Sequence, residues 1–271
     1  GLVNERLRTY TYLYPGPDQD AADFYNDATA SAETASLRVA EGFTAVKFDP
    51  AGQYTVYDGR MPDLEALERS ERFCREIRAA VGDSADMLFG THGQFTAAGA
   101  LRLAQRLEPY DPLWFEEPCP PDMPEEMAKV AAGTTIPVAT GERLCSKFEF
   151  ARVLDHGAAA ILQPDLGRAG GILEGKKIAA MAETRYVQIA PHLYCGPIVA
   201  AANIQLAACI PNFLILESIG RMDGFHAELL KTPLRWEDGY ILPPTAPGLG
   251  VELNDDVVAA HPWQGDRLHL E

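Results

Sequence analysis

The sequence predicts an α/β fold, namely a closed (β/α)8 barrel of the TIM type. Short apolar runs alternate with amphipathic stretches about eight times within about 210 residues, which is the count of such a barrel. The runs are almost continuously apolar, as is typical of parallel strands covered by helices. An open doubly wound sheet is the alternative, but it usually carries a glycine-rich turn after its first strand, and none follows Leu7–Tyr14.

The predicted strands are short runs of apolar, β-branched and aromatic residues that stop at glycine, proline or a polar residue. In chain order they are Leu7–Tyr14, Phe43–Phe48, Asp86–Gly90, Leu113–Pro118, Ile136–Glu142, Ala159–Leu162, Tyr186–Ala190 and Phe213–Leu216.

The predicted helices between these strands show apolar residues at helical spacing, and the first two end at a glycine, Gly42 or Gly82. They are Ala21–Glu41, Leu64–Val81, Ala97–Leu107, Glu125–Ala132, Phe148–Asp155, Gly170–Glu183 and Pro197–Ala207. We therefore expect a barrel domain over residues 1–227. The proline-rich residues 228–271 should form an irregular extension that packs on the outside of the barrel.

Charge and composition exclude several classes of protein. The net charge is −16, with 39 acidic against 23 basic residues, which argues against binding to nucleic acid or to an anionic membrane. No apolar run approaches the roughly 20 residues that span a bilayer, and no signal peptide is visible. The five cysteines form no C-x-x-C pair, which suggests reduced thiols in a cytoplasmic protein.

Two carboxylates end neighbouring predicted strands. Glu116 closes the run Leu-Trp-Phe-Glu-Glu-Pro, and Glu142 follows 26 residues later, about one strand–helix–strand repeat. Equivalent ends of neighbouring parallel strands converge, and oxygen ligands are what a hard divalent cation requires. The spacing therefore indicates a metal site made by Glu116 and Glu142.

Eight polar residues lie at or just after the ends of predicted strands, the face that carries the active site of such barrels. They are Lys47, Asp49, His92, Glu116, Glu142, Asp165, His192 and Glu217. Each alone could be a helix cap, a turn former or a solvated side chain, but eight on one face favour a site.

Their chemistry suits the removal of a proton next to a carboxylate. Asp165 and His192 are 27 residues apart, so they should lie on adjacent strands, and an aspartate would fix the histidine tautomer. His92 and Lys47 could approach from the opposite side. A bound divalent ion would stabilise the enediolate, and an acid could expel a β-hydroxyl as water.

Several motifs, taken together at their spacing, resemble the barrel domain of the enolase superfamily. The likeness is to the mandelate racemase subgroup, and most of all to its sugar-acid dehydratases of the galactonate dehydratase kind. The motifs are Val46–Asp49, Trp114–Pro118, Thr140–Leu144, Gln163–Asp165 with Gly170–Gly171, Pro191–His192 and Leu216–Glu217.

The resemblance implies Mg²⁺, with Mn²⁺ as the alternative, held by acids that end strands three, four and five; Glu116 and Glu142 match the last two. It also implies an Asp165–His192 pair, in which His192 is the base, and a Glu217 that hydrogen-bonds the substrate. His92 would be the general acid for the departing hydroxyl. Homo-oligomers are also typical of the family.

Three departures accompany this resemblance. Gly90 stands 26 residues before Glu116, where the family has a metal-ligating aspartate. The strand-two motif is Lys47-Phe48-Asp49 in place of Lys-x-Lys, which disfavours a racemase. Nothing before Leu7 supplies the N-terminal capping domain of the family. The sequence thus predicts a barrel without that domain, or a fragment.

The leading hypothesis is a metal-dependent lyase that dehydrates a small-molecule sugar acid to a 2-keto-3-deoxy acid through an enediolate. Lys47 would stabilise the carboxylate or serve as a second base. One alternative is a racemase, epimerase or cycloisomerase that uses the same intermediate. The other is a non-catalytic sugar-acid-binding barrel, because Gly90 replaces a metal ligand.

Overall fold

A computed structural model of the 271-residue chain describes residues 1–49, 59–263 and 265. All eight predicted strands are present as parallel strands in one sheet. They are β1 (Leu7–Tyr12), β2 (Ala45–Phe48), β3 (Asp86–Phe89), β4 (Trp114–Glu116), β5 (Val138–Thr140), β6 (Ile161–Leu162), β7 (Gln188–Ile189) and β8 (Leu216–Ser218). The predicted α/β class with a parallel sheet is therefore confirmed.

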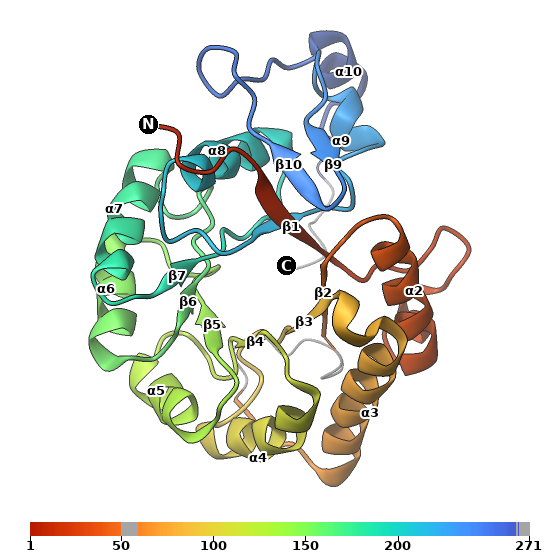
Figure 1. The fold of residues 1–271 in the computed structure, drawn as a ribbon, viewed down its shortest axis with the longest axis vertical. Helices are drawn as coiled ribbons and strands as arrows, with labels where there is room; N and C mark the ends of the chain where they lie inside the picture. The colour runs from red at the N-terminus through yellow and green to blue at the C-terminus, as the bar shows by residue number, and fades with distance from the viewer. Residues whose placement is uncertain (50–58, 264, 266–271) are drawn as a thin grey trace.

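The strands pair in sequence order from β1 to β7, and β8 returns to pair with β1. An isolated parallel bridge between Ile189 and Phe213 joins β7 to the segment before β8. Figure 1 shows the strands around a common centre with the helices outside them. The carboxyl ends of all eight strands consequently point to one end of the ring.

Helices follow the strands and cover the outer face of the sheet. The longer ones are α2 (Ala28–Ala40), α3 (Leu64–Val81), α4 (Ala97–Leu107), α5 (Pro124–Gly133), α6 (Lys147–His156), α7 (Ile172–Glu183) and α8 (Pro197–Ala208). The short ones are α1 (Ala21–Phe24), α9 (Phe225–Glu228) and α10 (Asp255–Ala260). Among the described residues, no helix has the length and apolar character to span a membrane.

The helix predicted over Ala21–Glu41 is in fact two helices, α1 and α2. The Asp27 carboxylate accepts hydrogen bonds from the backbone N–H groups of Thr29 and Ala30, which makes Asp27 the N-cap of α2. An aspartate that caps a new helix has an extended backbone and cannot also continue the preceding one. The prediction of one helix was wrong for this reason.

The segment after residue 227 is more regular than expected. Strands β9 (Arg235–Glu237) and β10 (Tyr240–Leu242) form a hairpin, and β10 pairs antiparallel with β1. The two-residue turn is Asp238-Gly239, both with positive φ, and Asp-Gly is a type I′ turn signal from which the hairpin could have been predicted. The domain boundary at 227/228 stays a prediction.

The inside of the ring is filled by one buried residue from each of the eight strand segments. They are Tyr10, Ala45, Leu88, Trp114, Ala139, Ile161, Ala190 and Ile215. Large and small residues complement one another, and the rings of Tyr10 and Trp114 meet edge to face with centroids 5.4 Å apart. A second, larger core lies between the sheet and the helices.

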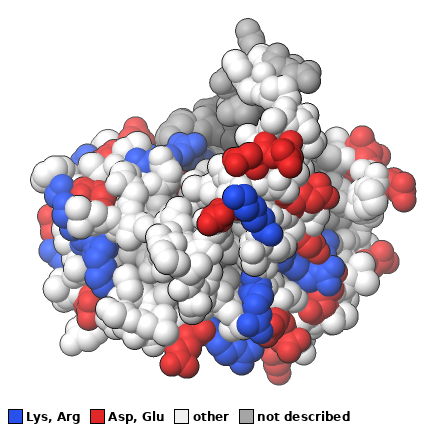
Figure 2. Space-filling view, turned by 90° about the horizontal axis from the view of Figure 1, so that it is seen from above, with Lys and Arg blue, Asp and Glu red and all other residues white. Residues whose placement is uncertain are grey.

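The N-terminal segment is tied to the outer layer beside α8 (Figure 1), since the Val3 N–H donates to the Ala208 carbonyl at 2.7 Å. Acidic and basic side chains are intermingled over the face seen in Figure 2. The net charge of −16 is therefore not gathered into a single patch on that face.

Candidate active site

The candidate site is the layer of residues directly beyond the packed interior. Side chains two residues apart on a strand share a face, so Lys47, Gly90, Glu116 and Glu217 follow the interior residues of their strands onto the same inner side. These positions lie at the ends of β2, β3, β4 and β8. The alternation of each strand thus places polar groups at one mouth of the ring, as the sequence predicted.

Lys47 is buried at this mouth and ion-paired. Its Nζ donates to Glu116 Oε1 at 2.6 Å and lies 3.7 Å from Glu217 Oε1. Burial alone would lower the pKa of Lys47, but the carboxylates of Glu116 and Glu217 raise it well above the usual value. The Lys47 side chain is therefore a cation held between two carboxylates, and its role as a second base stays a prediction.

Glu116 is surrounded by donors from the protein. Besides Lys47, the Nε1–H of Trp114 donates to Oε2 at 3.1 Å, and the Nε2 amide of Gln163 donates to the same oxygen at 2.8 Å. A carboxylate offers about four acceptor positions, and three are used. From the sequence Gln163 was only part of a motif, and its contact with Glu116 could not be foreseen.

Two aspartate–histidine pairs occupy the site. His192 Nδ1 lies 2.8 Å from Asp165 Oδ2, and His92 Nδ1 lies 3.0 Å from Asp49 Oδ2. Gly167 N–H also donates to Asp165 Oδ1 at 2.7 Å, which holds that carboxylate in place. The Asp165–His192 contact was predicted, but the Asp49–His92 pair was not. Each aspartate orients its imidazole so that Nε2 is left for chemistry.

Glu142 lies between the two imidazoles. Its carboxylate oxygens are 3.9 Å from His92 Nε2 and 3.6 Å from His192 Nε2. Burial would raise the pKa of Glu142, but the two imidazoles, Lys47 and Arg143 hold it below its usual value. Burial would lower the pKa of His192, but Glu142 and Asp165 together raise it to about 9. The pKa of His92 is also raised, because Asp49 and Glu142 outweigh its burial.

Glu217 connects His192 to Lys47. Its Oε2 accepts from the backbone N–H of Leu193 at 2.7 Å and lies 4.0 Å from His192 Nε2. Its Oε1 faces Lys47. All eight polar residues predicted at the strand ends therefore form one connected cluster through these contacts, namely Lys47, Asp49, His92, Glu116, Glu142, Asp165, His192 and Glu217.

Glu117 and Arg143 complete the cluster, and no role was predicted for either of them. Arg143 Nε lies 3.3 Å from Glu117 Oε2 and 3.6 Å from Glu142 Oε1, so one cation serves two carboxylates. Burial and the charge of Glu142 outweigh Arg143 and raise the pKa of Glu117 to about 8. Two features of the sequence could have pointed to these residues. Glu117 is the second acid of Glu-Glu-Pro, and Arg143 directly follows Glu142 in Gly-Glu-Arg.

The residues do not fit the divalent-cation site that the resemblance implies. Gly90 offers no ligand, and a Cβ built on it would meet Lys47 Cε at 3.1 Å. Glu116 already bonds the Lys47 ammonium, which would repel a metal ion. Among the described residues, no group of three or more His, Cys, Asp or Glu side chains is arranged to hold a metal ion.

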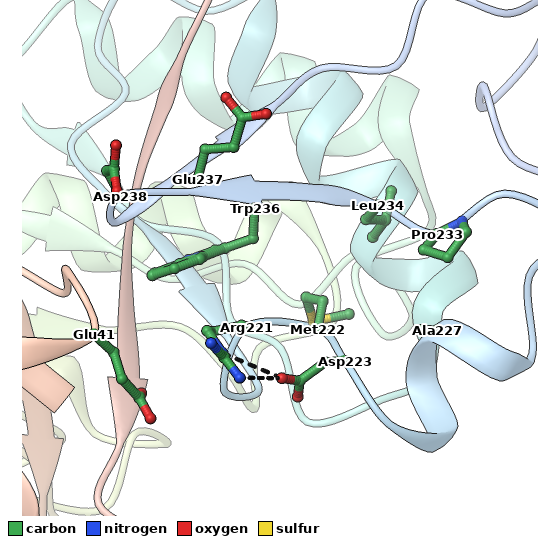
Figure 3. A pocket seen from close by; sticks show the side chains of 10 residues that line it. All are labelled: Glu41, Arg221, Met222, Asp223, Ala227, Pro233, Leu234, Trp236, Glu237 and Asp238. Carbon is green, nitrogen blue, oxygen red and sulfur yellow. Dashed lines mark hydrogen bonds and ion pairs between the residues drawn. The ribbon is translucent and has the colours of Figure 1, made fainter. Parts of the chain in front are cut away.

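A hollow in the described part of the chain lies elsewhere. It has a volume of about 540 Å³ and is formed by α9, the β9–β10 hairpin, the segment 221–223 and the end of α2. Figure 3 shows Trp236 along this hollow. It also shows Arg221 paired with Asp223, with Nη2 of the arginine 3.0 Å from Oδ2 of the aspartate. None of the predicted site residues lines it, so it is separate from the cluster of acids and histidines.

Comparison with known proteins agrees with the motifs. The family described as "Enolase C-terminal domain-like" matches residues 30–257. A D-galactonate dehydratase from Ralstonia nicotianae is 39% identical over 264 residues, which is 95% of this chain and 65% of that protein. A D-xylonate dehydratase from Haloferax volcanii is 37% identical over 276 residues, 100% of this chain and 65% of that one. The chain thus spans just under two thirds of the length of these curated relatives.

Solved structures show the same architecture. A mandelate racemase/muconate lactonizing enzyme-like protein from Roseovarius sp. TM1035 superimposes with a TM-score of 0.96 at 59% identity, over 100% of this chain and 68% of that one. A mandelate racemase/muconate lactonizing enzyme from Jannaschia sp. CCS1 gives 0.95 at 55% identity, over 100% and 69%.

Proposed function

Because the chain belongs to the enolase C-terminal domain-like family, we propose that it is the barrel domain of a hydro-lyase that removes water from a sugar acid. The ring of eight strands is, on this proposal, a (β/α)8 barrel of the TIM type with its catalytic groups at the carboxyl ends of the strands. The relatives named D-galactonate and D-xylonate dehydratase support this substrate class. A cytoplasmic location and a homo-oligomer stay predictions.

One observation carries the proposal: two aspartate-oriented imidazoles lie on either side of Glu142. Dehydration of a sugar acid needs one group that takes the proton α to the carboxylate and another that gives a proton to the β-hydroxyl. A pair of oriented histidines at one strand-end face provides both.

The proposed reaction assigns the base to His192. Its neutral Nε2 takes the α-proton, and Asp165 at Nδ1 stabilises the imidazolium that forms. His92, protonated and held by Asp49, gives the proton from Nε2 to the β-hydroxyl, which leaves as water. The enol that remains tautomerises to the 2-keto-3-deoxy acid. Glu217, close to both His192 and Lys47, is placed to hydrogen-bond the intermediate.

Mg²⁺ is the ion that members of the superfamily generally use, and when bound it stabilises the negative charge of the intermediate. Since Gly90 and the Lys47–Glu116 pair do not fit such an ion, no step of this reaction is assigned to it.

The test is a screen of sugar acids, among them D-galactonate and D-xylonate, for loss of water detected by mass spectrometry and for the 2-keto-3-deoxy product. The wild-type chain and a His156→Asn control, altered at an exposed histidine in the last turn of α6, should turn over the same substrate. The His192→Asn variant should lose activity by at least about 100-fold. Full activity of that variant would remove His192 from the mechanism.

A second candidate is a racemase or epimerase, which the opposition of the two imidazoles also favours. One histidine would remove the α-proton and the other would return a proton to the opposite face. This reaction incorporates deuterium at the α-carbon in D₂O without loss of water. Turnover with water loss selects the dehydratase. If no sugar acid loses water and none exchanges its α-proton, both enzymes are excluded and the non-catalytic binding barrel is left.

A further inference from the structure

The site contains a lysine beside the position where the family has a metal-ligating aspartate. Lys47 reaches from β2 across the end of β3, and its Cε and Cγ would lie 3.1 and 3.7 Å from a Cβ on Gly90. The carbonyl oxygen of Phe48 would be 3.4 Å away. A side chain at position 90 would therefore require the stem of Lys47 to shift by a few tenths of an ångström.

The ammonium of this lysine meets Glu116, one of the two carboxylates that were expected to hold the metal, and Glu217. Its Nζ donates to Glu116 at 2.6 Å and faces Glu217 at 3.7 Å. The other oxygen of Glu116, Oε2, accepts hydrogen bonds from Trp114 and Gln163. A metal ion at Glu116 would have to share a carboxylate that already bonds the Lys47 ammonium, and the two cations would repel each other.

We propose that the Lys47 ammonium replaces the divalent cation of this site and binds the carboxylate of the substrate. The substrate part of this inference rests on the proposed function. An ammonium carries three N–H donors, and Glu116 takes one of them, so donors are left for an incoming carboxylate. A lysine suits this task because it acts as a compact point charge.

The first experiment titrates Mg²⁺ and Mn²⁺ into the chain by calorimetry, with no substrate present. We expect no saturable binding to the wild type. The double variant Lys47→Met/Gly90→Asp removes the ammonium and adds a carboxylate beside Glu116 and Glu142. It should gain saturable binding, at least tenfold tighter than any binding by the wild type. Its fold is checked by circular dichroism.

The wild-type titration by itself decides the cation question, even if the variant does not fold. Saturable binding of either ion to the wild type, lost in Glu142→Gln, would overturn the proposal. This result does not depend on any substrate, so it is independent of the proposed function.

The second experiment measures binding and turnover of the same sugar acids after dialysis against EDTA. We expect the wild type to keep its binding and turnover, and Lys47→Met/Glu116→Gln, which removes both partners of the buried pair, to lose at least tenfold in affinity. The control Lys129→Met alters an exposed lysine on α5 and should leave binding unchanged. Activity or binding that is lost in EDTA and restored by Mg²⁺ would overturn the proposal.

A chain that binds no metal ion and no sugar acid would contradict the proposed function and the carboxylate role of Lys47. The replacement of the metal ion by the ammonium would still stand on the titration.

Discussion

At the scale of single residues, the site is a balance of charges. Lys47 bonds Glu116, Arg143 lies near Glu142, and the two imidazoles lie on either side of Glu142. Because these groups are buried, each one shifts the pKa of its neighbours. The protonation state of each residue follows from that balance, and it can be tested one residue at a time.

The pKa of His192 predicts how activity depends on pH. His192 must be neutral to act as a base, and its pKa is raised to about 9. We therefore expect kcat/KM to rise about tenfold per pH unit below pH 9, and to fall again at the higher pH where His92, the general acid, loses its proton. The Asp165→Asn variant removes a hydrogen bond that raises the pKa of His192. The rise of kcat/KM with pH should therefore move to lower pH, and kcat should fall at least about 100-fold. If Asp165 had only a structural role, the pH at which kcat/KM rises would stay the same.

Glu117 predicts a dependence of stability on pH. Its pKa is about 8 in the folded chain against 4.5 for the ordinary side chain. The folded state therefore holds this proton more tightly, and its stability falls as pH rises from about 4.5 to about 8. Glu117→Gln removes this loss, so its melting temperature should exceed that of the wild type more at pH 9 than at pH 5. Glu126→Gln, on the surface of α5, is the control. Parallel pH curves for wild type and Glu117→Gln would contradict the assignment.

At the scale of elements, the β9–β10 hairpin explains how the tail is fixed to the ring. Its turn lies against the end of α2, where the Asp238 backbone would be 3.1 Å from a Cβ on Gly42. Trp236 packs on Phe43 with ring centroids 4.7 Å apart, and its Nε1–H donates to Thr9 Oγ1 at 2.9 Å. The hairpin therefore joins the start of β1 to the segment between α2 and β2.

Gly239 is a position of this hairpin that should tolerate no side chain. Its φ is +83°, and a Cβ there would collide with the carbonyl oxygen of Gly42. We expect Gly239→Ala to lower the free energy of unfolding by about 1–3 kcal/mol, measured by urea denaturation. Gly196→Ala is the control, since Gly196 has φ −75° and a Cβ added there would meet no atom within 4 Å. Equal stability of Gly239→Ala and wild type would mean that the hairpin is not held in this way.

At the scale of the whole molecule, the packed interior of the ring supports the site above it. Trp114 is fully buried, touches Tyr10 from β1 and donates to Glu116. One side chain thus links the interior layer to the lysine pair. Damage to the interior should therefore affect both stability and chemistry.

The Trp114→Ala variant tests this link. It should lower the free energy of unfolding by about 3–5 kcal/mol, because it leaves a large cavity in the interior of the ring. It should also lower activity, since Glu116 loses one of its three donors. Trp263→Ala is the matched control, because Trp263 is 84% exposed and should change neither quantity. A stable and fully active Trp114→Ala protein would contradict the coupling.

Much of this architecture could be predicted from the sequence. The alternation of strands and helices depends on local patterns of apolar residues, so all eight strands could be placed from the sequence. The eight polar residues at their ends could be placed at one face in the same way. The Asp165–His192 pair could be predicted because a spacing of one repeat places two residues on adjacent strands. The errors, at Asp27 and at the β9–β10 hairpin, concern local signals that the sequence does contain.

The sequence by itself therefore determined the alternation of elements, the parallel sheet and the face that carries the polar residues. Only the tertiary structure decided which side chains pair within that face. It joined Asp49 to His92, filled the space over Gly90 with the stem of Lys47, and shared Arg143 between two glutamates. The physical reason is that patterns along a chain set which side of a strand a residue occupies. Contacts between side chains depend on distances of a few ångströms between strands, which no local pattern contains.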